Sequence, residues 1–194
     1  MRVLGIAGSP RRDGNTDLLL AEAMKGAAHR GAKVKTIVLS DLEIAPCQHC
    51  DTCLDTGQCW IKDDMQKVYR ELSKADRIVL ASPLHFMGVT AQTKAMIDRC
   101  QALWARKYKL NMPPLGNKRE RKGLFISVGA RSEDDMFAPA IATVKSLCRV
   151  LDITYAGELV FSGVDEKGAI TKHPDALRQA FVTGQRLVDD SSAE

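Results

Sequence analysis

Four cysteines lie close together in the segment CQHCDTCLDTGQC, residues 47–59. The spacers between them are two, two and five residues long. Thiol groups at such short spacing can form disulfides, bind a zinc ion or hold an iron–sulfur cluster. The rest of the chain must show which of these three kinds of chemistry applies.

The start of the chain argues against disulfides. The segment MRVLGIAGSP carries one charge and a short apolar run that leads into a glycine turn, which is typical of a buried strand and not of a secretion signal. No apolar run approaches the length of a membrane span. We therefore expect a cytoplasmic protein without a membrane partner. In the reducing cytoplasm, clustered cysteines are more often metal ligands or redox groups than disulfides.

The compact spacing favours a [4Fe–4S] cluster. Three thiolates would lie on one tight turn, and Gly57 would allow the chain to reverse and bring back the fourth. Structural zinc more often takes two separated pairs of ligands, so zinc is the alternative occupant. The predicted ligands are Cys47, Cys50, Cys53 and Cys59. The other two cysteines, Cys100 and Cys148, lie among apolar residues of helical stretches and are predicted to be buried structural residues.

The elements that position these groups alternate along the chain. Apolar, β-branched runs predict strands at 3–8, 34–39, 77–82, 123–129 and 153–161. Helical spacing of apolar residues predicts helices at 16–30, 64–74, 90–105, 135–150 and 174–189. Such alternation predicts an α/β fold with a parallel sheet covered by helices on both faces. We expect a single domain over residues 1–190, with residues 47–59 as an insertion.

The loop GSPRRDGNT, residues 8–16, follows the first predicted strand and opens a helix. It combines hydroxyl and amide donors, a cation and the unpaired N–H groups of a helix N-terminus, which together suit one terminal phosphate monoester. The donors and the cation are Ser9, Arg11 or Arg12, Asn15 and Thr16. The alternative is a polar strand-to-helix turn with a Ser or Thr cap. A phosphate loop at this place predicts the sheet order 2-1-3-4-5.

The loop SPLHFMGVT, residues 82–90, follows the third predicted strand. Pro83 stiffens the strand exit, and Gly88 permits close approach of the backbone. Phe86 and Met87 offer apolar surface to a ring system. A plain loop with two core anchors is the alternative.

These loops and the five-strand pattern resemble the flavodoxin-like NAD(P)H-dependent FMN reductase superfamily over nearly the whole chain. The resemblance implies a flavodoxin-like three-layer fold and FMN as cofactor. It implies that the first loop holds the FMN phosphate through Ser9, Arg11, Asn15 and Thr16. It also implies that the isoalloxazine edge lies along Pro83, Leu84, His85, Phe86, Met87 and Gly88, with the pocket closed from Gly129. His85 stands where relatives often carry tyrosine.

The segment CQHCDTCLDTGQCWIKDDM looks like the cysteine motif of the iron–sulfur flavoproteins, a branch of this superfamily, with all four ligand positions present. The resemblance implies an FMN-dependent oxidoreductase or electron-transfer flavoprotein that couples a [4Fe–4S] cluster to FMN. The alternatives are a cluster-free NAD(P)H:FMN or quinone reductase and a non-catalytic FMN electron carrier. The resemblance also suggests a homodimer or homotetramer, with NAD(P)H or a small redox protein such as ferredoxin as partner.

Charge adds one further feature. Residues 106–122 carry seven basic side chains against the single Glu120. We interpret this segment as a solvated surface loop, with a landing patch for an anionic partner as the alternative. No pattern typical of nucleic-acid recognition accompanies the charge, so nucleic acid is not expected. Lys94, Asp98 and Arg99 are interpreted as a solvated or structural ion-pair face.

Overall fold

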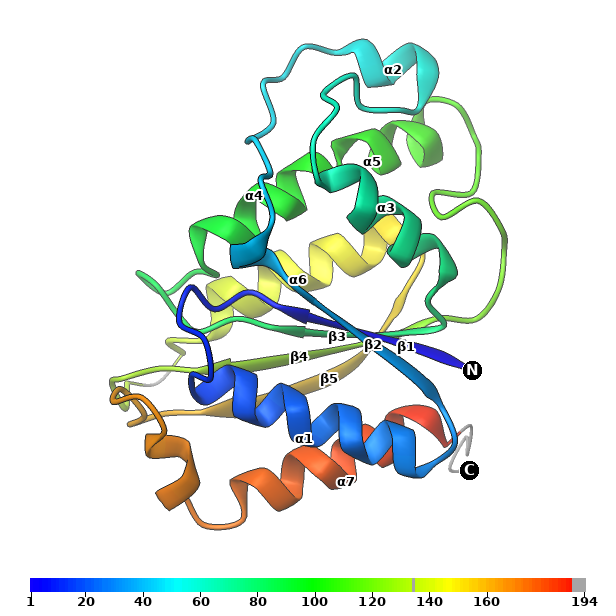
Figure 1. The fold of residues 1–194 in the computed structure, drawn as a ribbon. Coiled ribbons are helices and arrows are strands. Elements are labelled where there is room, and N and C mark those ends of the chain that lie inside the picture. Colours follow the sequence, from blue (N-terminus) through cyan, green and yellow to red (C-terminus); the bar gives the residue numbers. More distant parts are fainter. Residues whose placement is uncertain (134, 190–194) are drawn as a thin grey trace.

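A central parallel sheet organises the molecule. The computed structural model describes residues 1–133 and 135–189, so the predicted domain end at residue 190 lies outside the described residues. The strands are β1 (Arg2–Ala7), β2 (Lys33–Val38), β3 (Arg77–Ala81), β4 (Lys122–Val128) and β5 (Thr154–Phe161). All neighbours pair in parallel, in the order β2-β1-β3-β4-β5. The predicted flavodoxin-like sheet order is confirmed (Figure 1).

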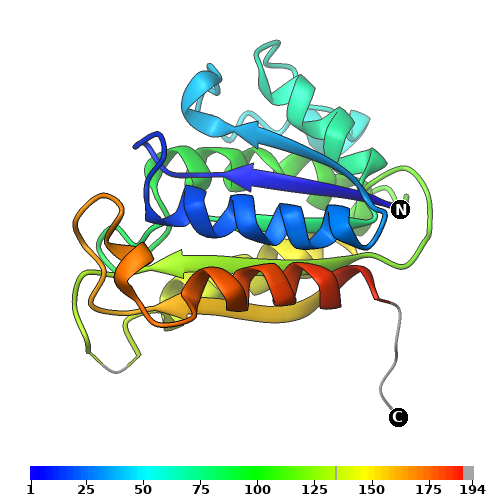
Figure 2. The ribbon, with the colours of Figure 1, turned by 60° about the horizontal axis from the view of Figure 1, so that its bottom comes forward.

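Helices cover both faces of this sheet (Figures 1 and 2). One face carries α1 (Asn15–His29) and α7 (Ala176–Val188), and the other carries α3 (Met65–Lys74), α4 (Ala91–Arg99), α5 (Gln101–Tyr108) and α6 (Ala138–Leu151). The short elements are η1 (Leu39–Asp41), α2 (Thr52–Thr56) and η2 (Ala169–Lys172). The predicted helix at 90–105 is in fact two helices, because Cys100 leaves helical geometry with ψ near 0° between them. None of the described helices has both the length and the apolar character needed to cross a bilayer.

Side-chain alternation along the strands builds two cores. On β1, Val3 and Ala7 pack with α1 and α7, whereas Leu4 and Ile6 pack with residues of α3, α4 and α6. Successive side chains of a strand point to opposite faces, so a strand buried on both sides must be apolar at every position. This is why the central strands read as continuous apolar runs.

Two glycines allow α1 and α7 to lie unusually close together. A Cβ atom on Gly184 would overlap the backbone carbonyl of Ala23 on α1. A Cβ atom on Gly26 would likewise overlap the carbonyl of Phe181 on α7. The backbones of the two helices therefore touch directly, and any side chain at these positions would force them apart.

Buried hydrogen bonds bring together the loops that leave the strands. The Thr90 hydroxyl donates to the carbonyl of Gly8 at 2.6 Å, and the Gly8 N–H donates to the carbonyl of Ala81 at 2.7 Å. The Ser127 hydroxyl donates to the carbonyl of Ser82 at 2.7 Å. The loops after β1, β3 and β4 are thus fixed side by side at the carboxyl edge of the sheet, where ligands bind in folds of this kind.

Candidate functional site

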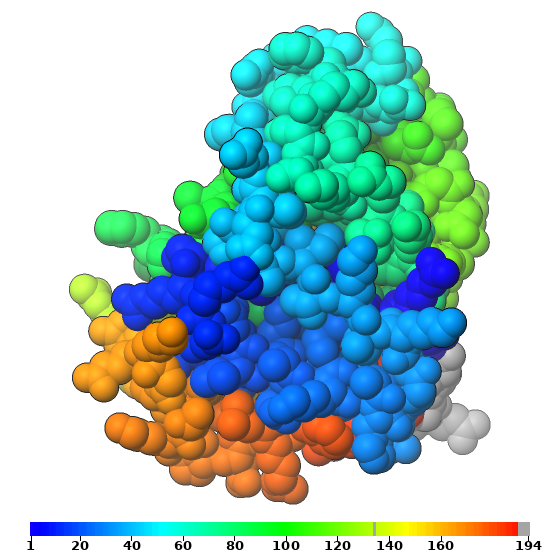
Figure 3. Space-filling view, in the orientation of Figure 1, coloured from blue at the N-terminus to red at the C-terminus, as the bar shows by residue number. Residues whose placement is uncertain are grey.

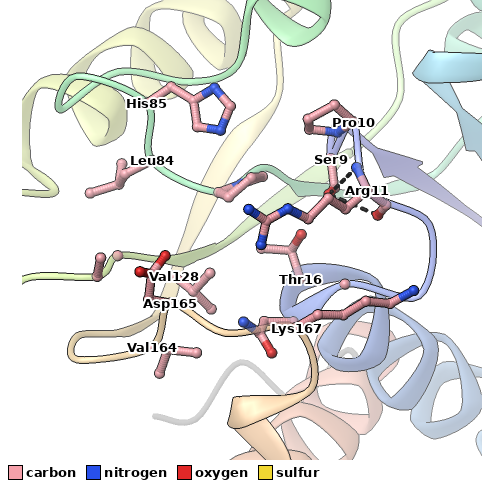
Figure 4. A pocket seen from close by; sticks show the side chains of 15 residues that line it. Ser9, Pro10, Arg11, Thr16, Leu84, His85, Val128, Val164, Asp165 and Lys167 are labelled. Atoms are coloured by element: carbon pink, nitrogen blue, oxygen red, sulfur yellow. Dashed lines mark hydrogen bonds between the residues drawn. The ribbon is translucent and has the colours of Figure 1, made fainter.

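A cavity of about 150 Å³ opens at this edge of the sheet (Figure 4). Its walls come from residues within 9–16, 83–85, 128–130 and 164–167. The first three segments are the loops that the sequence predicted to meet. The fourth, after β5, was missed, because Val164, Asp165 and Lys167 belong to a stretch without a recognisable motif.

The loop at residues 8–16 presents one cation that has no carboxylate partner among the described residues. Ser9 is buried, and its hydroxyl donates to the Arg11 carbonyl at 2.9 Å while accepting from the Arg11 N–H at 3.1 Å. This bonding fixes the turn, and the Arg11 side chain extends toward the cavity (Figure 4). Among the described residues no carboxylate pairs with Arg11, whereas Arg12 forms an ion pair with Asp41. Of the two arginines, Arg11 is therefore the one that is available to bind an anion in the cavity.

The N-terminus of α1 faces the same cavity. Gly14 caps it without a side-chain hydrogen bond, and Thr16 is almost fully buried at the cavity wall. The side chain of Asn15 also contacts the loop after β5. Its amide donates to the Glu166 carbonyl at 2.9 Å and accepts from the Ile170 N–H at 3.2 Å. Asn15 therefore fastens the loop after β5, and its backbone N–H and the second N–H of its side-chain amide remain for an anion.

The loop after β3 forms a two-residue hairpin. The N–H of His85 donates to Gly88 O at 2.9 Å, and the N–H of Gly88 donates to His85 O at 3.0 Å. Both residues at the tip, Phe86 and Met87, have positive φ, at 50° and 61°. Such values are unfavourable for bulky side chains and often mark functional sites.

The predicted ring-binding residues divide between two hollows. Pro83, Leu84 and His85 line the first cavity, whereas Phe86 and Met87 line a neighbouring hollow of about 670 Å³ together with Leu84 and His85. Gly129 lines the first cavity, and a Cβ atom there would strike Cε of Met136, which lines the second. Phe86 is fully exposed. The two hollows share Leu84 and His85, so they form one continuous edge.

The cysteine segment lies far from the sheet, between η1 and α3. In Figures 1 and 3 it is the cyan part at the top of the molecule. All its cysteines carry free thiols, with Cys50 exposed and the other three partly buried. Gly57 ends α2 in the left-handed conformation, with φ of 66°, and its N–H donates to the Cys53 carbonyl at 2.9 Å. The predicted reversal of the chain at Gly57 is confirmed.

The four thiols share one electrostatic environment. The pKa of Cys53 is raised, first by burial and then by the charges of Cys59, Cys47 and Cys50. Within residues 1–133 and 135–189, however, no three His, Cys, Asp or Glu side chains are gathered as closely as a metal site requires. Four neighbouring free thiols have the donor chemistry of an iron–sulfur site, and their sulfur atoms must close in to hold a cluster.

Cys100 and Cys148 are buried, as predicted. Burial raises the pKa of Cys100 to about 12 and that of Cys148 to about 11. Both thiols therefore stay protonated and behave as small apolar groups in the core.

The ion pairs predicted for Lys94, Asp98 and Arg99 are present, one of them solvated and the other structural. Lys94 and Asp98 form an exposed pair at 2.8 Å, but Arg99 is buried and pairs with Asp63 at 2.6 Å. Asp63 lies just beyond the cysteine segment. Nothing in the spacing of the sequence distinguishes a buried arginine from an exposed one on the same helix.

The basic segment 106–122 is not simply a solvated loop. Arg121 is buried and donates to the Ala75 carbonyl at 3.1 Å, and Arg119 pairs with Asp76 at 3.1 Å. Lys107 pairs with Asp152 at 2.5 Å. These cations hold the segment against the rest of the protein, so part of the positive charge of the segment stabilises the fold.

Comparison with known proteins identifies the family. Residues 1–162 match the family described as NADPH-dependent FMN reductase. A protein of Archaeoglobus fulgidus called iron–sulfur flavoprotein is 43% identical over 66% of this chain, an alignment that spans 61% of that relative's own length. A second protein of the same name and organism is 37% identical over 100% of this chain and 96% of its own.

A solved structure called flavone reductase superposes on 97% of this chain and 62% of its own, with a TM-score of 0.71 and 22% identity. At this low identity the likeness supports the fold alone. The family match and the nearly full-length relative are stronger, because they rest on the sequence itself. The chain therefore belongs to the NADPH-dependent FMN reductase family, in its branch of iron–sulfur flavoproteins.

Proposed function

We propose that this protein is an FMN-dependent oxidoreductase in which FMN exchanges electrons with a [4Fe–4S] cluster. The observation that carries the FMN part is the cavity where the unpaired Arg11 side chain meets the open N-terminus of α1. The cluster part rests on the four free thiols of one short segment in a chain related to iron–sulfur flavoproteins. FMN takes up electrons singly or in pairs, and an iron–sulfur cluster passes them one at a time.

In this proposal Arg11 neutralises the FMN phosphate, and the first N–H groups of α1 donate to it. Ser9 keeps the turn in shape, and Asn15 holds the loop after β5 against the cavity. Pro83, Leu84 and His85 line the path from the phosphate to the ring. Phe86 and Met87, exposed at the hairpin tip, offer apolar contact to the ring or to a second subunit.

Cys47, Cys50, Cys53 and Cys59 are the proposed ligands of the cluster, with zinc as the alternative occupant. Of these, Cys50 has a lowered pKa, chiefly because the backbone and then the side chain of Thr52 stabilise its thiolate. Iron and zinc both bind thiolates, so a ready supply of thiolate at Cys50 favours either.

We further propose that residues 1–190 act as one domain and assemble as a homodimer or homotetramer. The open hollow beside the hairpin tip, with exposed Phe86 and Met87, is the surface that a second copy would cover. The proposed electron donor is NAD(P)H or a small redox protein such as ferredoxin. Because the thiols are not gathered into a metal-ready group, a cluster-free NAD(P)H:FMN or quinone reductase is the second candidate. A non-catalytic FMN carrier is the third.

Anaerobic reconstitution with FMN, iron and sulfide tests the proposal. We expect one FMN and about four iron and four sulfide per chain, as a [4Fe–4S] cluster requires. Tight zinc binding with no sulfide would support the cluster-free reductase. Oxidation of NAD(P)H with a quinone or ferric acceptor would then separate either enzyme from a carrier, which would bind FMN without turnover.

A further inference from the structure

Arg99 is a buried cation at the base of the cysteine segment. Its side chain is fully shielded from solvent, at 0% exposure. Two guanidinium nitrogens bind the Asp63 carboxylate, Nη1 at 2.6 Å and Nη2 at 3.1 Å. A forked pair of this kind fixes both orientation and distance. In the exposed Lys94–Asp98 pair, by contrast, one nitrogen contacts both carboxylate oxygens.

The same guanidinium joins the two ends of the segment. Nη1 donates to the Ala45 carbonyl at 2.8 Å, before the first cysteine, and Nη2 donates to the Ile61 carbonyl at 3.3 Å, after the last. Asp63 strengthens the closure by accepting from the Ala45 N–H at 2.9 Å. The Tyr69 hydroxyl donates to the backbone carbonyl of Arg99 at 2.5 Å, which ties α4 to α3 at this point. Arg99 and Asp63 therefore hold the two ends of the cysteine segment close together.

One polar atom of Arg99 has no partner. Its Nε is buried, and within the described part of the chain no acceptor binds it. An unsatisfied buried N–H is costly, and each such group in a folded protein calls for an explanation. Burial by itself would lower the pKa of Arg99, but Asp63 and the nearby Cys59 raise it, so the guanidinium keeps its charge.

We propose that Arg99 is a positioning residue for the iron–sulfur cluster, closing the base of the cysteine segment with Asp63 and holding a fixed positive charge beside it. The inference rests on the cluster proposed above. Reduction adds a negative charge to a cluster, so a buried cation nearby stabilises the reduced state and raises the reduction potential.

The test compares Arg99→Met and Arg99→Lys with a matched control, Lys94→Met. The control removes one cation from the same helix, but from an exposed pair. Arg99→Lys keeps the positive charge but loses the two-nitrogen contact with the Asp63 carboxylate. Three quantities are measured: the rate at which a thiol reagent modifies the metal-free protein, the iron and sulfide content after reconstitution, and the cluster potential by redox titration. Asp63→Asn serves as a second variant, which removes the negative charge and retains an oxygen acceptor.

We expect Arg99→Met to raise thiol reactivity severalfold, lower iron content and lower the potential of any cluster formed. Arg99→Lys should raise thiol reactivity but largely keep the potential, and Asp63→Asn should raise the potential. Lys94→Met should match the wild type in all three. If Arg99→Met and Asp63→Asn both leave thiol reactivity and potential unchanged, the inference is wrong. If the wild type itself takes up no iron and sulfide, the proposed function fails instead, and the thiol rates still decide whether Arg99 closes the segment.

Should Arg99→Met fail to fold, Arg99→Lys and Asp63→Asn carry the test, because each preserves one member of the pair. Unchanged thiol rates and potential in both would overturn the inference.

Discussion

The side-chain oxygen of Asn15 accepts a hydrogen bond from the backbone N–H of Ile170 at 3.2 Å, which joins the first helix to the loop after the last strand. The amide nitrogen of the same side chain donates to Glu166 O at 2.9 Å. The fourth wall of the cavity is thus fixed by one residue of the phosphate loop.

Asn15→Ala should release the loop after β5 from the start of α1. Two backbone groups lose their partner, so we expect the free energy of unfolding to fall by about 1–3 kcal/mol. FMN should bind more weakly, because the loop no longer closes the cavity. Urea denaturation and FMN titration by fluorescence quenching measure the two effects. Asn15→Asp keeps the acceptor for Ile170, so it should fall between the wild type and the alanine variant; equal stability of all three would contradict the assignment.

Arg11→Ala should weaken FMN and leave riboflavin unchanged. In the proposed site this cation serves only the phosphate, and loss of a charge-assisted hydrogen bond costs about 1.5–3 kcal/mol, roughly a ten- to hundredfold rise in Kd. Titration of both flavins against both proteins gives the comparison. Arg12→Ala is the control, because Arg12 pairs with Asp41 and should not affect either flavin. A similar loss for riboflavin would assign Arg11 to the ring or to the fold.

Native metal-free protein should react with iodoacetamide first at Cys50. Hydrogen bonding from Thr52 lowers the pKa of this exposed thiol, so its thiolate forms at lower pH than that of an ordinary cysteine. Burial raises the pKa of Cys100 to about 12 and that of Cys148 to about 11, so both should stay unmodified up to about pH 9. Mass spectrometry of labelled peptides over a pH series follows each site. Labelling of Cys100 before unfolding would contradict its structural role.

Gly184→Ala should destabilise the protein, because the added methyl group overlaps the carbonyl of Ala23 and must push α7 away from α1. Overpacking of this kind costs about 1–3 kcal/mol. Thermal unfolding of the FMN-free protein measures the loss. Gly88→Ala makes the same chemical change where the nearest atom lies 3.5 Å away, so its melting temperature should stay near that of the wild type.

Replacing Phe86 and Met87 by Asn and Gly should stabilise the FMN-free protein. Both positions have positive φ, which the new residues adopt readily, and Phe86 is fully exposed, so little buried contact is lost. We expect the free energy of unfolding to rise by about 1–3 kcal/mol. If the hairpin tip contacts the flavin ring, FMN affinity should fall at the same time. A variant that is less stable without FMN would show that the tip carries no strain.

Sequence patterns predicted the strands and the sheet order because buried parallel strands leave a continuous apolar signal, as at Ile78 to Ala81. They also placed the loops of the cavity, since the carboxyl ends of parallel strands share one edge. The break between α4 and α5 could not be predicted, because Cys100 is compatible with a helix and neither glycine nor proline marks the position.

The roles of Asn15 and Arg99 were beyond the reach of the sequence for another reason. Asn15 binds backbone groups more than 150 positions away, and backbone groups have no sequence signature. Arg99 binds the ends of a segment that precedes it by dozens of residues. Local spacing identifies which residues have useful chemistry, whereas long-range contacts decide which of them face the ligand.

Ala45 and Ile61 lie close together, because their carbonyls bind the same guanidinium. The cysteine segment between them could therefore be removed without moving the residues on either side. Its two ends already meet at the base, so a short turn could replace it without stretching the crossover from β2 to α3. The cavity proposed for FMN lies at the carboxyl edge of the sheet, and none of its lining residues comes from the segment. Under the proposed function, the same scaffold could therefore gain or lose the cluster by a single insertion or deletion, while the proposed FMN site stays intact.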